Sequence, residues 1–300
     1  MTGPAGKWHG ARERRLRICR EESWGCCPEE PSWSVVPVFG DGYKLKAANP
    51  HFRPATQFGG WKRSVHISHL QIVTGRFVTL PWPQVTGLLL EMALDREAGA
   101  LPSYCMDYCT PADPRRHLGV MVDDLDVIAS AAGRDVEFRF ALQAAAEEAN
   151  AGLTENDFDY SGISPVPFMF DRAALKLDGT PVTGVEQFTL RVKNSLAEGP
   201  NRGGTVAFLL AGQRAVSLEM RKLDDGDAFN AAVRTGGVIG FEATLLHPEG
   251  YCLCLELPVL HPEGGEEDAE PGRLARASLR MEAGTDGEGN DISYTLDLGA

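Results

Sequence analysis

The stretch VEQFTLRVKN (residues 185–194) decides the fold class, because its apolar residues fall at every second position. One side of the stretch carries Phe188, Leu190 and Val192, and the other side carries Thr189, Arg191 and Lys193. Such alternation is typical of a β-strand that packs one face on an apolar core and turns the other face to water. The chain is therefore expected to contain a half-buried sheet.

The same alternation occurs in VEFRFALQ (residues 136–143). Its apolar positions are Val136, Phe138, Phe140 and Leu142, and its polar positions include Glu137, Arg139 and Gln143. The preceding run HLGVMVDDLDVIASA and the turn AAGRD predict a hairpin that ends in this strand. Four more alternating runs, GVIGFEATLL, YCLCLELPVL, ARASLRMEA and DISYTLDL, follow toward the C-terminus. The pattern predicts a mainly β chain.

Two short helices are expected between the strands. PQVTGLLLEMALDR (residues 83–96) begins with proline and has apolar residues at helical spacing, and LDDGDAFNAAVRTGG (residues 223–237) ends in glycine. Three segments are expected to be turns or loops: Thr74-Gly75, residues 97–117, and the acidic HPEGGEEDAEPGR over 261–273.

The length of 300 residues favours two domains, since a domain has roughly 150 residues. Residues 119–148 can be laid over 167–198 with Phe138 on Phe188, which indicates two tandem related β-domains. The expected organisation is an irregular basic arm over 1–30, a first domain over 31–150, a linker over 151–165 and a second domain over 166–300.

The charge of the chain is strongly acidic. It has 29 basic and 42 acidic residues, a net charge of −13, with 43% hydrophobic and 24% charged residues. An acidic protein repels phosphate, so tight binding of a nucleic-acid backbone through counter-ion release is not expected. No apolar run reaches the roughly 18 residues of a membrane-spanning helix, so no membrane insertion is expected.

The sequence contains no recognisable catalytic motif. G-x-S-x-G, H-E-x-x-H, a P-loop and a dinucleotide fingerprint are all missing from it. Cys105 and Cys109 lie near His117 in an expected loop, which leaves a Cys/His metal-dependent enzyme as a remote alternative. The expectation is a protein that is not an enzyme and that has no catalytic, cofactor-binding or metal-binding residues.

A long segment of the second half carries a family resemblance. It reads PFMFDRAALKLDGTPVTGVEQFTLRVKNSLAEGPNRGG and is followed by AGQRAVSLEM. In its strand spacings it resembles the tail tube proteins (major tail proteins) of long-tailed bacteriophages. The resemblance implies a β-sandwich whose hairpins join across subunits into a continuous β-barrel around a lumen. Single-domain members form hexameric rings, so a duplicated chain would need only three copies for a pseudo-hexameric ring.

The resemblance also implies a location and partners. A tail tube subunit is assembled in the host cytoplasm and becomes part of the virion tail. It stacks as rings, encloses the tape-measure protein, contacts the tail terminator and tail-tip proteins, and later conducts DNA during ejection. The alternative is a β-sandwich binding module, such as an adhesin or a baseplate protein.

The polar faces of the two quoted strands are the candidates for the lumen surface. These lumen-facing candidates are Glu137, Arg139, Gln143, Thr189, Arg191 and Lys193. The net charge of −13 then suggests that acidic side chains line the lumen, where they would repel phosphate and let DNA slide without sticking.

Overall fold

The structure is a computed structural model of the chain. It describes residues 15–38, 43–48, 51–52, 67–68, 72–96, 99–109, 114–199, 206–223, 236–268, 276–287 and 289–299. Strands dominate these residues, so the mainly β prediction is confirmed.

The elements of the first half are β1 (Arg15–Arg20), β2 (Ser34–Val36), β3 (Lys44–Ala48), β4 (His51–Phe52), β5 (Ile67–Ser68), β6 (Ile72–Thr79), α1 (Pro83–Leu94), β7 (Tyr104–Cys109), β8 (Arg115–Ser130), β9 (Val136–Ala144) and β10 (Ala146–Ala149). Two 3-10 turns follow, η2 (Glu155–Asp157) and η3 (Phe170–Arg172). The elements of the second half are β11 (Ala173–Leu177), β12 (Thr180–Pro181), β13 (Val185–Lys193), β14 (Ala197–Glu198), β15 (Leu209–Leu210), β16 (Ala215–Leu223), β17 (Ile239–Leu246), β18 (Cys252–Asp268), β19 (Arg276–Ala283) and β20 (Ser293–Asp297).

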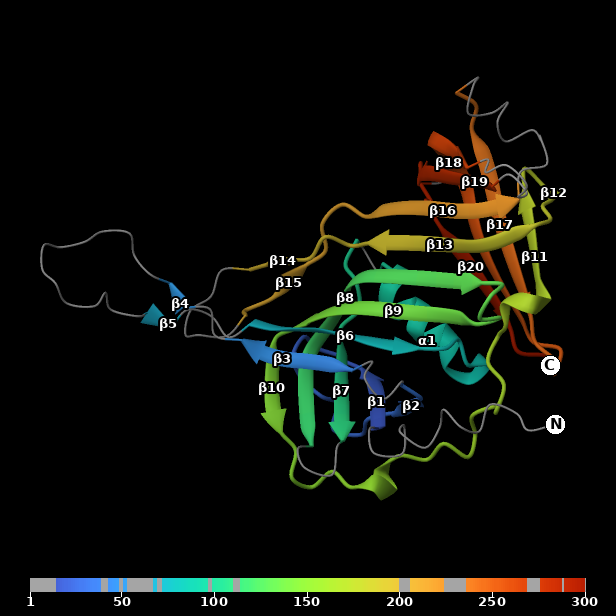
Figure 1. Cartoon of the computed structure of the whole chain (residues 1–300). Coiled ribbons are helices and arrows are strands. Elements are labelled where there is room, and N and C mark those ends of the chain that lie inside the picture. The colour runs from blue at the N-terminus through green and yellow to red at the C-terminus, as the bar shows by residue number, and fades with distance from the viewer. Residues whose placement is uncertain are drawn as a thin grey trace, which may run out of the picture.

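Sixteen of the described strands form one sheet (Figure 1). The same pairing order occurs twice in it: β2-β1-β7-β8-β9-β6-β3 in the first half, and β12-β11-β17-β18-β19-β16-β13 in the second. The two series, here called the N-terminal and C-terminal strand sets, are joined by antiparallel pairing between β8 and β13. Two short pairs of strands are separate from this sheet. Along the chain, β4 and β5 lie between β3 and β6, and β14 and β15 lie between β13 and β16, which are the corresponding strands of the second set.

The two strand sets also share their irregularities. β8 and β18 are the longest strands of their sets. The first half of β8 pairs with β7 and β10, and its second half pairs with β9. In the same way, the first half of β18 pairs with β17 and β20, and its second half pairs with β19. In β8 the register to β9 shifts at Asp123, and in β18 the register to β19 shifts at Glu263. Bulges are specific structural features, so their recurrence at matching places supports the correspondence between the sets.

A single large apolar core runs through both strand sets. Phe77 stacks on Phe140 with ring centroids 4.5 Å apart, and Phe188 meets Phe241 edge to face at 5.6 Å. The predicted helix over 83–96 is confirmed as α1, which packs its apolar side against the sheet. Burial of this apolar core is the main favourable contribution to the stability of the fold.

The expected alignment of residues 119–148 with 167–198 is wrong in its details. β8 and β9 pair as a hairpin, whereas β11 pairs with β12 and β17 while β13 pairs with β8 and β16. The strand that corresponds to β9 in pairing order is β19, not β13. The match of Phe138 to Phe188 reflects the common alternation of half-buried strands.

Several segments expected to be loops are strands. Residues 15–20, within the expected irregular arm, form β1, in which Leu16 and Ile18 are fully buried. Part of the expected loop over 97–117 is β7, and the acidic residues 261–268 extend β18. β1 and β7 are held by pairing to each other across some ninety residues of sequence, and residues 261–268 by pairing to β19, contacts that local composition does not reveal. Most of the second predicted helix, residues 224–235, lies outside the described residues.

The predicted turn at Thr74-Gly75 is also wrong, because β6 passes straight through it. Gly75 lies opposite Leu45 of β3, and a Cβ atom built on it would lie only 1.8 Å from the carbonyl oxygen of Lys44. The glycine is therefore required by close approach of two backbones rather than by a turn.

We expect Gly75→Ala to lower the free energy of unfolding by about 1–3 kcal/mol, because the added methyl group would force β3 away from β6. Gly152→Ala is the matched control, since a Cβ there meets no atom within 4 Å. Chemical denaturation of both variants measures the difference. Equal stability of the two would show that β3 and β6 do not approach this closely.

Candidate functional site

The polar face of the sheet carries all six lumen-facing candidates. On β9 and β13 the residues between the buried ones are Glu137, Arg139 and Gln143, and Thr189, Arg191 and Lys193. Their side chains are exposed or half-buried, whereas Phe138, Phe140, Phe188 and Leu190 on the opposite face are buried. The prediction of which residues of these two strands face the core and which do not is therefore confirmed.

Ion pairs cross this face. Arg139 pairs with Glu137 at 2.7 Å, Arg191 with Asp126 at 2.7 Å, and the longer Arg221–Glu186 separation is 3.6 Å. These groups are partly exposed, so each pair contributes little to stability. Each of these six charged groups therefore has a neighbour of opposite sign.

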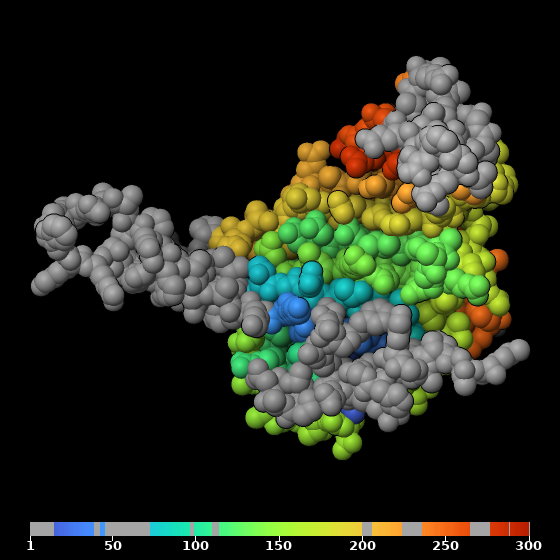
Figure 2. Space-filling view, in the orientation of Figure 1, coloured from blue at the N-terminus to red at the C-terminus, as the bar shows by residue number. Residues whose placement is uncertain are grey.

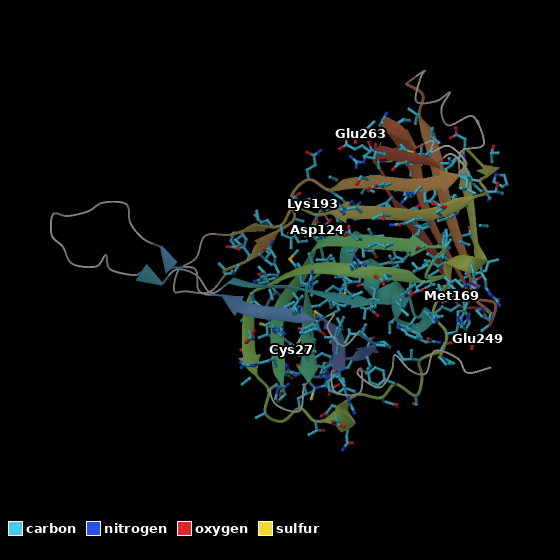
Figure 3. The ribbon with its side chains drawn as sticks, in the orientation of Figure 1. Cys27, Asp124, Met169, Lys193, Glu249 and Glu263 are labelled. Atoms are coloured by element: carbon cyan, nitrogen blue, oxygen red, sulfur yellow. The ribbon has the colours of Figure 1, made fainter. Side chains whose placement is uncertain are left out.

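Arg191–Asp126 lies on the boundary between β8 and β13, which we call the internal seam. Arg191 stands directly opposite Asp126 in the register, and the pKa of Arg191 is raised by its hydrogen bond to that carboxylate. One step along the seam, Lys193 stands opposite Asp124 (Figure 3). Partial burial and the neighbouring Asp123 raise the pKa of Asp124, and Lys193 opposes this shift. Opposite charges therefore face each other along the internal seam.

The polar face carries charges of both signs in similar numbers. Its charged side chains on the described strands include the cations Lys44, Arg76, Arg139, Arg191, Lys193, Arg221 and Arg280 and the anions Asp123, Asp124, Asp126, Glu137, Glu186, Glu219 and Glu282. The net charge of the chain therefore does not specify where its charges lie, and the expectation of an acidic lumen stays a prediction.

Figure 2 shows the green and yellow bands of β8, β9, β13 and β16 packed without a break across the face of the molecule. The strand series β3-β6-β9-β8-β13-β16-β19-β18 within this sheet has two ends. At one end β3 pairs with β6 alone, and at the other end residues 261–268 of β18 pair with β19 alone among the described strands. By contrast, the corresponding half of β8 pairs on both sides, with β9 and β13. The two ends of this series therefore present strand edges whose ladder groups have no partner strand within the described residues.

A profile of the family "Phage tail tube protein" matches residues 73–298, about three quarters of the chain. The chain belongs to this phage tail tube protein family. The match runs from β6 to β20, so it includes the internal seam and the whole C-terminal strand set but not β1, β2 and β3 of the N-terminal set. Family membership identifies a structural protein of the virion tail and implies self-assembly into the tube.

No curated protein matches the chain significantly. None of the described helices has the length and apolar character needed to cross a bilayer.

The tail tube family is a structural one, and the residues of the remote metal-enzyme alternative do not converge in the described chain. Cys105 is buried beside Cys27, whereas Cys109 packs with Leu153 and Phe158. No group of three or more His, Cys, Asp or Glu side chains within the described residues has a geometry suited to a metal ion. His117 is buried against Tyr43 instead, with its Nδ1 atom 2.9 Å from the tyrosine hydroxyl.

The burial of His117 predicts a pH dependence. Burial lowers the pKa of His117, and Glu147, 3.4 Å from its Nε2 atom, partly opposes this shift. An unfolded histidine titrates near pH 6.5, so the unfolded chain binds more protons below that pH. Stability contributed by the neutral, buried ring is thus present above about pH 6.5 and is lost as the pH falls.

We therefore expect the free energy of unfolding of the wild type to fall more steeply between pH 7.5 and about 5.5 than that of His117→Gln. All other titrating groups are the same in the two proteins, so the difference between their stability curves reports on His117. Parallel stability curves for the two proteins would contradict a neutral His117 in the folded state.

Proposed function

We propose that this chain is the subunit from which the tail tube itself is built. In this proposal three copies form one ring, rings stack into the tube, and the tube encloses the tape-measure protein and later conducts DNA. Assembly takes place in the host cytoplasm, and the tube ends meet the tail terminator and tail-tip proteins. Membership of the tail tube family supports the proposal.

The repeated strand order is the observation that supports three copies of the chain in each ring. We take the N-terminal and C-terminal strand sets to be two related β-domains, with residues 151–165 as the linker, joined through the internal seam. Three such chains would present six similar domains, equal in number to the subunits of a ring of single-domain family members. A ring of six complete chains is the competing possibility.

We assign the polar face to the lumen. This orientation leaves the apolar core and α1 outside the barrel wall, where the rest of each domain can cover them. The six candidates would then line the channel with compensated charge rather than with a cationic surface. Because a phosphate backbone binds to uncompensated cations, a nearly neutral lumen gives DNA no strong hold.

The β14–β15 hairpin is suited to contact between rings. It extends from the sheet in Figure 1, and it carries exposed apolar side chains, with Leu210 57% and Phe208 39% exposed. Apolar groups on a projecting hairpin are costly in water and favour burial against another subunit.

Electron microscopy of the purified protein tests the ring. We expect rings or short tubes with three-fold symmetry and six similar lobes, and a mass of three chains per ring by light scattering. Six complete chains per ring would overturn the trimer, and a stable monomer at high concentration would contradict the tube assignment.

We expect Leu210→Asp to shorten tubes strongly while leaving single rings intact, because a charge would oppose burial between rings. Leu246→Asp is a matched control, since Leu246 of β17 is 48% exposed but lies outside the hairpin. Tube length distributions by negative-stain imaging provide the readout. Tubes of wild-type length for Leu210→Asp would exclude this hairpin from stacking.

A further inference from the structure

We infer that residues 264–268 of β18 pair antiparallel with β3 of a second copy of the chain, with Glu266 directly opposite Lys46. We call this contact the external seam. The inference rests on the proposed ring, and it adds which two edges meet and in which register.

The internal seam provides the template. Asp123 and Glu263 mark the same bulge in β8 and β18, so each residue of β8 corresponds to the residue 140 positions later in β18. Following the pairs outward through β9 and β6, and through β19 and β16, each residue of β3 corresponds to the residue 145 positions later in β13. The contact of β13 with β8 therefore has a counterpart between β3 and β18.

A chain cannot make this counterpart with itself, because β3 and β18 terminate opposite ends of the series β3-β6-β9-β8-β13-β16-β19-β18. Figure 3 shows this separation: Asp124 and Lys193 lie together at the internal seam, whereas Glu263 lies at the far edge of the sheet on β18. A head-to-tail contact between copies satisfies both edges, and such contacts generate a closed ring when the rotation per copy closes.

The transferred register brings opposite charges together. On the internal seam Arg191 faces Asp126 and Thr189 faces Ile128. The corresponding positions of the external seam are Lys46 opposite Glu266, and Lys44 opposite Asp268. In the internal seam the cation Arg191 lies on β13 and the anion Asp126 on β8. In the external seam the cation Lys46 lies on β3, which corresponds to β13, and the anion Glu266 lies on β18, which corresponds to β8. Opposite charges directly across an antiparallel pair are favourable.

The same charges select against the other pairings of these edges. Two β3 edges facing each other would bring Lys44 and Lys46 of both copies together, and two β18 edges would bring together their acidic residues, including Glu266 and Asp268. Like charges across a ladder are unfavourable. A second copy docked head to tail is therefore the occupant that fits each edge.

Disulfide trapping tests the register. In the full chain carrying Lys46→Cys and Glu266→Cys, mild oxidation is expected to give covalent dimers and then trimers that reductant dissolves. Lys46→Cys with Glu267→Cys is the matched control, since neighbouring residues of a strand point to opposite faces. Each single variant measures the background from the native cysteines. Equal cross-linking by the two pairs would overturn the register.

A charge swap tests the same contact without cysteines. Lys46→Glu is expected to need about tenfold more protein for half-assembly, because the change acts at every seam of the ring. Adding Glu266→Lys should restore assembly, while Arg172→Glu, an exposed change in η3, should leave it unaltered. Wild-type rings together with no effect of either charge change and no cross-link would overturn the external seam and leave the tube assignment standing. A monomeric wild type would instead overturn the tube assignment itself.

Discussion

Backbone pairing between β8 and β13 is the interaction on which the rest of the structure depends. It joins two sets of strands into one sheet and aligns their apolar faces over a shared core. Without it each set would expose a strand edge, and unpaired edges are prone to aggregation. The seam combines ladder hydrogen bonds, buried neighbours such as Leu190 beside Val127, and the Arg191–Asp126 ion pair on the water side.

The repeated pairing order gives this seam a wider meaning. The pairing of β13 with β8 inside one chain provides a template for pairing between the corresponding strands, β3 and β18, of two chains. The bulges at Asp123 and Glu263 matter here, because a register that differed by one residue would turn every side chain to the wrong face. The equivalence of the sets therefore constrains both the choice of edges and their alignment.

Much of the fold could be predicted from the sequence, for local reasons. Alternation identified β9 and β13 with their correct faces, and proline with helical spacing identified α1. The two-residue turn at Asp178-Gly179, where both residues have positive φ, has the Asp-Gly sequence that favours such a turn. These features depend on residues that are neighbours along the chain.

The parts that could not be predicted depend on distant partners. β1 and β7 pair with each other and bury Asp107 between Arg17 and Arg116, a network that local composition does not indicate. Gly75 was expected in a turn because its real constraint, the backbone of β3, lies some thirty residues away in sequence. The two-fold repetition was visible only as a weak similarity, since pairing order survives after residue identity has been lost.

The place of the acidic residues in the fold changes how the net charge of the chain is interpreted. Net charge suggested that acidic residues line a channel, yet the polar face of the sheet is nearly balanced. Part of the excess lies in residues 263–268, which continue β18 rather than forming a loop in solvent. A strongly acidic edge repels a second acidic edge and accepts a cationic one, so it restricts pairing to a complementary strand. Charge on the edge strand β18 affects which strand can pair with it. Charge on the polar face of the sheet would instead affect a molecule that moves along that face.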